Sequence, residues 1–198
     1  MRKSFLFLVA VIASTNLFAQ NKTSIRETFE SNKWQWDEFY EKSCSAGIED
    51  GFLVIKNSNS ETSVRSVVEF PVDIDKNFKI TLKMVPERIN DRNWFGFVYN
   101  YEDENNFNSF LIQEKKYLII NKVNGVSSIS RQGGIILKSG KNKEVTLEIE
   151  KKGNKLIFTV DNMEVISITK ILKFNTFGCC IYGDGTLKVD EVLLEQVR

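Results

Sequence analysis

Apolar and polar residues alternate strictly through the middle of the chain, and this alternation restricts the fold more than any other feature. Apolar side chains occupy every second position from Phe78 to Met84, and again from Val145 to Ile149. A period of two places successive side chains on opposite faces of a β-strand, whereas an amphipathic helix repeats every three or four residues. The alternation resumes at Leu156 after the Gly153-Asn154 turn, which predicts a β-hairpin.

Further segments of the same kind fill most of the remaining chain, and they are bounded by Gly, Asn and Asp. About a dozen short strands without a helical period predict an all-β sandwich or barrel. No repeat or Pro/Gly/Ser-rich linker divides the chain, so a single domain over residues 20–198 is expected. The additional predicted strands are Gly51–Lys56, Val64–Phe70, Trp94–Tyr99, Phe107–Glu114, Tyr117–Val123, Met163–Ile168, Thr176–Tyr182 and Leu187–Leu194.

The first residues have the pattern of a secretory signal peptide. Arg2 and Lys3 precede an apolar run from Phe5 to Ala13, and a small residue, Ala19, follows. The predicted signal peptide is residues 1–19, with cleavage after Ala13 as an alternative and a buried N-terminal strand or helix as the other interpretation. We therefore expect an exported protein that resides in the periplasm, at the cell surface or outside the cell.

Two kinds of membrane attachment are not expected. The apolar run is about half of the roughly 20 residues that a membrane-spanning helix needs, and no later segment is as apolar over that length. The first cysteine, Cys44, lies far beyond the end of the apolar run, so a lipid-anchored N-terminus is not indicated.

The charge balance argues against a nucleic-acid partner. Removing Arg2 and Lys3 from the 27 basic residues leaves 25, against 26 acidic ones. A nucleic-acid-binding domain normally has a clustered basic footprint. We therefore expect no nucleic-acid partner, and, from the length of the apolar run, no membrane span.

The chain contains no histidine, which removes the commonest general base and metal ligand. Its three cysteines lack the paired spacing of a zinc site, and no cofactor is expected. Cys44 forms a disulfide with Cys179 or Cys180 in one interpretation. In the other, all three are small buried hydrophobic residues.

The order of the segments resembles a concanavalin A-like, laminin-G-like jelly-roll domain of secreted bacterial proteins. The resemblance covers nearly all of residues 20–198 and depends on the arrangement, because each piece alone is weak. The matching pieces are Glu27–Glu30 with Trp34 and Trp36, Glu49–Ile55, Phe78–Met84, Phe95–Tyr99, Glu104–Phe107, Phe110–Ile112, Lys152–Leu156, Phe177-Gly178 and Val189–Val192.

The resemblance implies two curved antiparallel sheets, a fold that hosts carbohydrate-binding modules, glycan hydrolases and structural domains. Some hydrolases of this fold carry a Glu-x-Asp-x-x-Glu strand, which this sequence lacks. The nearest acidic cluster, Glu102 to Glu104, is contiguous and is predicted to be a solvated turn. Lys138 to Lys143 is predicted to be a solvated loop. The resemblance is therefore to the non-catalytic type.

The fold also implies where a ligand would bind, namely on the outer face of the curved sheet. If Phe95, Phe97 and Tyr99 face inward, alternate residues face the groove. Leu111 and Ile119 would then face outward as well, which suggests either the opposite register or a loop covering this sheet. The candidate ligand-binding residues are Trp94, Asn100, Ser109, Gln113, Tyr117, Asn121 and, at the rim, Arg131.

Aromatic side chains are also predicted at the ends of the sandwich. Trp34 and Trp36 share a strand face in the predicted fold and are expected to cap the sandwich. Asp161, Asn162 and Asp184 have the oxygen ligands that calcium prefers, but turns use the same residues for their own backbone. We therefore assign no metal.

Three functional hypotheses follow. The chain is a module that binds polysaccharide or glycan on its concave sheet, a structural or oligomeric cell-envelope protein without a small ligand, or a divergent carbohydrate-active hydrolase. The first is preferred because sugars stack on aromatic rings and bind planar polar groups.

Overall fold

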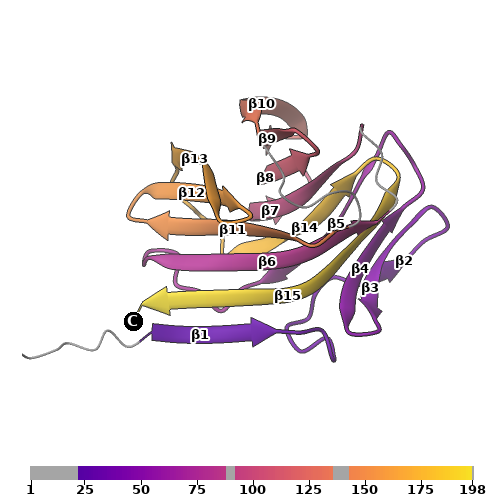
Figure 1. Ribbon diagram of the computed structural model, residues 1–198, viewed down its shortest axis with the longest axis horizontal. Helices are drawn as coiled ribbons and strands as arrows, with labels where there is room; N and C mark the ends of the chain where they lie inside the picture. Colours follow the sequence, from indigo (N-terminus) through magenta and orange to yellow (C-terminus); the bar gives the residue numbers. More distant parts are fainter. Residues whose placement is uncertain (1–21, 88–91, 136–142, 198) are drawn as a thin grey trace, which may run out of the picture.

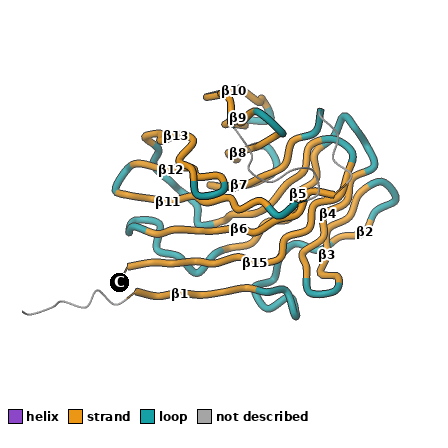
Figure 2. Tube along the Cα trace, viewed as in Figure 1, coloured by secondary structure: helices purple, strands orange, loops and turns teal. Residues whose placement is uncertain are grey.

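The computed structural model describes residues 22–87, 92–135 and 143–197. The predicted signal peptide and most of the predicted loop 138–143 lie outside these residues. The described chain consists of strands and connecting turns, as Figure 2 shows. It contains no α-helix, and therefore none of the length and apolar character of a membrane span.

The strands form two antiparallel sheets, which face each other across one core (Figure 1). The first sheet has nine strands, in the order β13-β12-β11-β6-β15-β4-β3-β2, with β1 paired to β15. Its strands are β1 (Lys22–Glu27), β2 (Phe39–Tyr40), β3 (Cys44–Glu49), β4 (Phe52–Asn57), β6 (Phe78–Glu87), β11 (Val145–Lys152), β12 (Lys155–Val160), β13 (Met163–Thr169) and β15 (Gly185–Val197).

The second sheet has six strands, in the order β10-β9-β8-β7-β14-β5. Consecutive strands from β7 to β10 form a meander, whereas β14 comes from near the C-terminus and pairs between β7 and β5. Its strands are β5 (Ser63–Glu69), β7 (Trp94–Asp103), β8 (Asn106–Gln113), β9 (Lys116–Val123), β10 (Val126–Gly134) and β14 (Thr176–Tyr182).

The core lies between the sheets because alternate residues of each strand point to it. Leu82 and Ile149 from the nine-stranded sheet and Phe97 and Ile181 from the six-stranded sheet are all fully buried in it. Burial of this apolar surface is the main force that holds the two sheets together. The same alternation places the intervening residues on the two outer faces of the sandwich.

The alternation predicted most strands correctly, including the hairpin of β11 and β12. It missed β1, β2, β3 and β10, which are short or polar and carry little apolar contrast. The tryptophan prediction was wrong in detail, because Trp34 and Trp36 lie between β1 and β2, outside any strand. Both rings pack edge-on against Phe70.

The cysteines are all unpaired. Cys179 faces the core and Cys180 faces the outer side of the same sheet, and both are fully buried. These two therefore fit the interpretation as small hydrophobic residues. Cys44 is half-buried, so neither the disulfide nor full burial holds for it.

Candidate functional site

The outer face of the six-stranded sheet carries an apolar cluster that is separate from the core. Val98 belongs to it, and its two neighbours Phe97 and Tyr99 point the opposite way into the core. Outer faces of antiparallel sheets are usually solvated and polar, so buried apolar residues there mark this face as a candidate interaction surface. The fully or nearly buried members are Val67, Val98, Phe107, Leu111 and Cys180, and the half-buried members are Trp94, Tyr101, Leu118, Ile120 and Tyr182.

Four aromatic residues of this cluster share the outer face with an arginine, Arg65. Trp94 and Tyr182 are direct cross-strand partners on β7 and β14. The rings of Tyr101 and Phe107 lie 5.9 Å apart between centroids. We name Arg65, Trp94, Tyr101, Phe107 and Tyr182 the aromatic face.

Arg65 reaches far across this face. It starts on β5, yet its guanidinium lies 4.6 Å from the ring centroid of Phe107 on β8. The strands β14 and β7 lie between β5 and β8, so the side chains of Arg65 and Phe107 reach toward each other across both. Its Nη2 donates to Ser63 Oγ at 3.3 Å, and its Nη1 lies 4.0 Å from the carboxylate of Glu104. The side chain is only 14% exposed, which strengthens its cation–π contact with Phe107.

Two glycines lie where the arginine crosses the sheet. Gly96 is the cross-strand partner of Cys180, and Cys180 is the partner of Arg65. A Cβ atom on Gly96 would overlap the carbonyl oxygen of Phe110, and one on Gly178 would overlap that of Ser66. Only glycine therefore allows the neighbouring strands to approach this closely.

The two tyrosines of the aromatic face keep their protons. Burial raises the pKa of Tyr182, and the nearby Cys180 raises it further. Burial also raises the pKa of Tyr101, although the charge of Arg65 acts against this. Both side chains therefore present a neutral hydroxyl group at neutral pH, which can donate or accept a hydrogen bond.

A cleft lies at the end of the sheet, beside the aromatic face. Its volume is about 240 Å³, and asparagine side chains form much of its wall. We name it the amide cleft. It is lined by Asn100, Glu102, Asn106, Phe107, Asn108, Asn121, Lys122, Val123, Lys170, Ile171, Lys173 and Phe174.

Asn100 connects the cleft to the sheet because its backbone leaves the strand conformation. Its φ of 52° lies in the left-handed region, which asparagine tolerates better than most residues. Its Oδ1 accepts the backbone N–H groups of Lys173 at 2.6 Å and Phe174 at 3.2 Å. These bonds hold the segment between β13 and β14 as the far wall of the cleft.

The structure separates the predicted site residues into several places. Trp94, Ser109 and Gln113 lie on the outer face, and Ser109 is fully buried there. Asn100 and Asn121 line the amide cleft instead. The predicted residues therefore do not form one groove.

Tyr117 and Asn121 are corrections to the predicted face. Both share the face of Ile119, which is fully buried in the core. Tyr117 is 9% exposed, and its ring packs against Phe110 with centroids 6.3 Å apart. The expectation that Ile119 faces outward was wrong for the same reason, whereas Leu111 does face outward as predicted.

Arg131 lies on the exposed strand β10, at the free edge of the sheet. Its Nη1 donates to the backbone oxygen of Ser130 at 2.7 Å. The sequence analysis did not select Arg65, Tyr101, Phe107 or Tyr182 as candidate site residues. Alternation in β14 contained a usable signal, because Tyr182 and Cys180 alternate with core residues Cys179 and Ile181.

The predicted acidic cluster is solvated as expected, but only Glu104 lies in the turn, because β7 extends to Asp103. Glu102, Asp103 and Glu104 are all exposed. Asp103 accepts hydrogen bonds from the side chain of Asn106 and the backbone N–H of Asn105, and these bonds lower its pKa. This carboxylate therefore stabilises the turn between β7 and β8.

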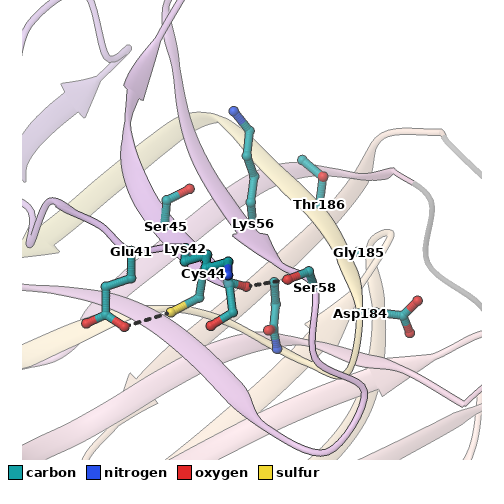
Figure 3. Close-up of a pocket in the computed structure, with 11 residues that line it drawn as sticks. Glu41, Lys42, Cys44, Ser45, Lys56, Ser58, Asp184, Gly185 and Thr186 are labelled. Atoms are coloured by element: carbon teal, nitrogen blue, oxygen red, sulfur yellow. Dashed lines mark hydrogen bonds between the residues drawn. The ribbon is translucent and has the colours of Figure 1, made fainter.

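A larger pocket on the other sheet has less suitable chemistry. It has a volume of about 440 Å³ and lies between the 41–45 segment and the start of β15 (Figure 3). Figure 3 shows Cys44 Sγ directed at the carboxylate of Glu41, 3.6 Å away. Burial raises the pKa of this thiol, and Glu41 raises it further, so Cys44 is a poor nucleophile.

The calcium candidates serve turns. Asp161 and Asn162 both have left-handed φ values, and Asp161 Oδ1 accepts the backbone N–H of Thr146 at 3.1 Å. The backbone oxygen of Asp184 accepts a hydrogen bond from Asn93 Nδ2. Within residues 22–87, 92–135 and 143–197, no three Cys, Asp or Glu side chains gather as metal ligands.

Comparison with known proteins extends the assignment of the fold. No protein-family model matches the sequence, and no curated protein matches it. Many solved structures do. A Bacillus subtilis protein of unknown function with a galectin-like fold has a TM-score of 0.63 and 11% identity, over 88% of this chain and 96% of that one.

Two further neighbours act on or recognise carbohydrate according to their names. The catalytic domain of an endo-1,3-β-glucanase (laminarinase) from Thermotoga petrophila has a TM-score of 0.61 and 9% identity, over 90% and 99% of the two chains. The carbohydrate recognition domain of Emp46p has a TM-score of 0.61 and 13% identity, over 86% and 95%. With its two antiparallel sheets, the chain has the concanavalin A-like jelly-roll fold that the order of its segments predicted.

Proposed function

We propose that this protein is a glycan-binding module that holds a polysaccharide against the aromatic face. One observation carries the proposal. Trp94, Tyr101 and Tyr182 lie partly exposed on the outer face of the six-stranded sheet, which also carries Arg65 over the ring of Phe107. Contiguous aromatic surface of this kind marks an interaction site more often than a solvated face.

The chemistry of the face suits sugars. The C–H face of a pyranose ring stacks on an indole or phenol ring, and such contacts bury apolar surface on both partners. Sugar hydroxyl groups need hydrogen-bond partners, which the hydroxyls of Tyr101 and Tyr182 and the N–H groups of Arg65 supply. The partly buried position of Arg65 fixes its donors before the ligand arrives.

Two further points support a carbohydrate ligand. Solved neighbours with the same fold include a carbohydrate recognition domain and a laminarinase catalytic domain. The predicted signal peptide would place the protein outside the cytoplasm, where polysaccharides are common ligands.

The test is affinity electrophoresis of the purified protein through gels that contain single polysaccharides, both neutral and acidic. We expect at least one polysaccharide to retard the wild type. Trp94→Ala should weaken that binding by about tenfold to a hundredfold, because a central aromatic anchor is lost. Tyr40→Ala is the matched control, since Tyr40 is an exposed aromatic residue (66%) on the nine-stranded sheet.

Two results would contradict the proposal. If no polysaccharide retards the wild type, or if Trp94→Ala and Tyr40→Ala behave alike, the structural envelope protein becomes the better account. Release of reducing ends from a retained polysaccharide would instead favour the hydrolase.

A further inference from the structure

The amide cleft is electropositive although the chain as a whole is close to neutral. Three lysines line it, Lys122, Lys170 and Lys173, against a single carboxylate, Glu102, although the ammonium group of Lys122 lies by the ring of Phe107 on the outer face. The formal charge of the complete sequence is only +1. Positive charge is therefore concentrated around one cleft.

The two lysines on the far wall have no acidic partner among the described residues. On the nine-stranded sheet, by contrast, Lys79 and Lys83 each pair with glutamate within 4 Å. Lys170 is half-buried, and its burial together with the charge of Lys173 lowers its pKa. An anion in the cleft would relieve this repulsion.

Three asparagine side chains in the cleft form a series of hydrogen bonds in which each amide donates to the next. Asn100 Nδ2 donates to Asn108 Oδ1 at 3.3 Å, and Asn108 Nδ2 donates to Asn121 Oδ1 at 2.5 Å. The series ends at Asn121, whose Nδ2 donates to no group in the described part of the chain. Its amide N–H groups are therefore available to an acceptor that enters the cleft.

The cleft meets the aromatic face at the end of β8 and β9, where Asn108 and Asn121 lie on the core side of the sheet and the ring of Phe107 lies on its outer side. Phe107 belongs to both, and Lys122 Nζ lies 5.4 Å from the centroid of its ring. A sugar chain that stacks on Tyr101 and Phe107 would have to pass round this end of the sheet for its next units to reach the cleft.

From this geometry we propose that the amide cleft binds the carboxylate or sulfate group of an acidic sugar unit, through Lys170, Lys173 and Asn121. The preferred ligand is then an anionic polysaccharide. This inference rests on the proposed function, since it adds a charged subsite at the end of the sheet that carries the aromatic face.

The experiment compares polysaccharides that differ only in charge. Polygalacturonate is compared with its methyl-esterified form for the carboxylate, and dextran sulfate with dextran for the sulfate. We expect the charged member of at least one pair to bind about tenfold or more tightly than its neutral counterpart at low salt, with the advantage falling as salt rises. The pair that shows it identifies the anion.

The variant Lys170→Gln/Lys173→Gln should remove most of this advantage and leave binding of the neutral polymer unchanged. Lys115→Gln/Lys116→Gln is the matched control, because it removes two exposed lysines at the opposite end of the same sheet. Asn121→Asp should weaken binding of the charged polymer further, since it replaces the amide donor with a negative charge that repels the anion.

The outcomes separate the two proposals. If the wild type binds charged and neutral members equally and Trp94→Ala abolishes both, the charged subsite is wrong and the aromatic face stands. If the two double lysine variants lower the affinity for the anionic polymer equally, the attraction is diffuse and the cleft is not its source. If no polymer binds, both proposals fail.

Discussion

On the outer face of the nine-stranded sheet, Lys79 lies between two carboxylates, at 3.0 Å from Glu148 and 3.5 Å from Glu195. On the outer face of the six-stranded sheet, Arg65 lies over the ring of Phe107. The two faces are the outer surfaces of the same sandwich, and the fold allows charged or aromatic residues on either. One has charged cross-strand pairs that suit water, and the other has aromatic rings that suit a ligand.

The difference supports the proposal that the aromatic face is under a constraint beyond folding. Exposed ion pairs between strands contribute little to stability and keep an outer face solvated. Partly exposed tryptophan and tyrosine leave some apolar surface in water, which folding alone does not favour. The aromatic face is therefore where we expect binding, and the charged face where we expect tolerance to substitution.

The largest expected effect is on folding and tests whether the six-stranded sheet is as tightly built as its contacts indicate. Gly178→Val places a side chain against the backbone oxygen of Ser66 and against Val67. We expect the free energy of unfolding to fall by about 3 kcal/mol or more, because the strands cannot separate without breaking their ladder. Urea denaturation measures this value.

The matched control for that substitution is Gly153→Ala in the β11–β12 turn, where no atom lies within 4 Å of the new Cβ. Its positive φ of 59° still disfavours alanine, by about 1 kcal/mol. Equal losses for the two variants would show that the packing of the sheet does not require Gly178.

A smaller effect is expected at the centre of the aromatic face. Arg65→Ala removes the cation–π contact with Phe107 and exposes apolar surface that the arginine side chain covers. The free energy of unfolding should therefore fall by about 1–2 kcal/mol. Glycan affinity should fall by about tenfold or more. Arg65→Lys keeps the charge but loses the planar group, so it should restore stability better than affinity. If the lysine variant binds as well as the wild type, the planar guanidinium is not required.

The smallest effect is expected on the charged face. Lys79→Met removes both ion pairs, and we expect less than about 1 kcal/mol of change in unfolding free energy at pH 7, with unchanged glycan affinity. Burial acts to lower the pKa of Lys79, but Glu148 and Glu195 outweigh it and raise the pKa above its ordinary 10.5. The stability that the two ion pairs contribute is therefore fully present below pH 10.5, and it is lost as the pH rises through the raised pKa of Lys79. A difference between wild type and variant that grows above pH 10.5 would contradict this assignment.

The strands could largely be predicted from the sequence because burial on one face imposes a period of two. Thr176–Tyr182 was predicted with its exact bounds, and the β11–β12 hairpin with its correct turn. The strand Val126–Gly134 was missed because almost all its residues are exposed on both faces, so no alternation is required there.

The faces of individual residues were harder to predict. Gln113 and Lys116 are partners across a two-residue turn, so residues that point outward have odd numbers on β8 and even numbers on β9. The prediction carried the odd numbers across this turn and placed Tyr117 and Asn121 outside. At Asn100 the left-handed φ ends the alternation of β7 and turns the side chain toward Asn108.

The centre of the candidate site depends on contacts that no local pattern shows. Arg65 and Phe107 lie on strands that are separated by two others, one of which comes from near the C-terminus. Their contact follows from strand order, which a single sequence does not fix. Trp94 was accessible to prediction because it alternates with Phe95, a core residue of the same strand.

The most direct test of the account maps the bound glycan onto the two faces by NMR. Oligosaccharides of the polysaccharide that binds best are titrated into isotope-labelled protein, and backbone and side-chain shifts are followed. We expect the indole of Trp94, the ring of Tyr101 and the guanidinium of Arg65 to shift together and saturably, while Lys79 and Lys83 stay unchanged. Saturable shifts on the nine-stranded sheet with none on the aromatic face would contradict the central claim.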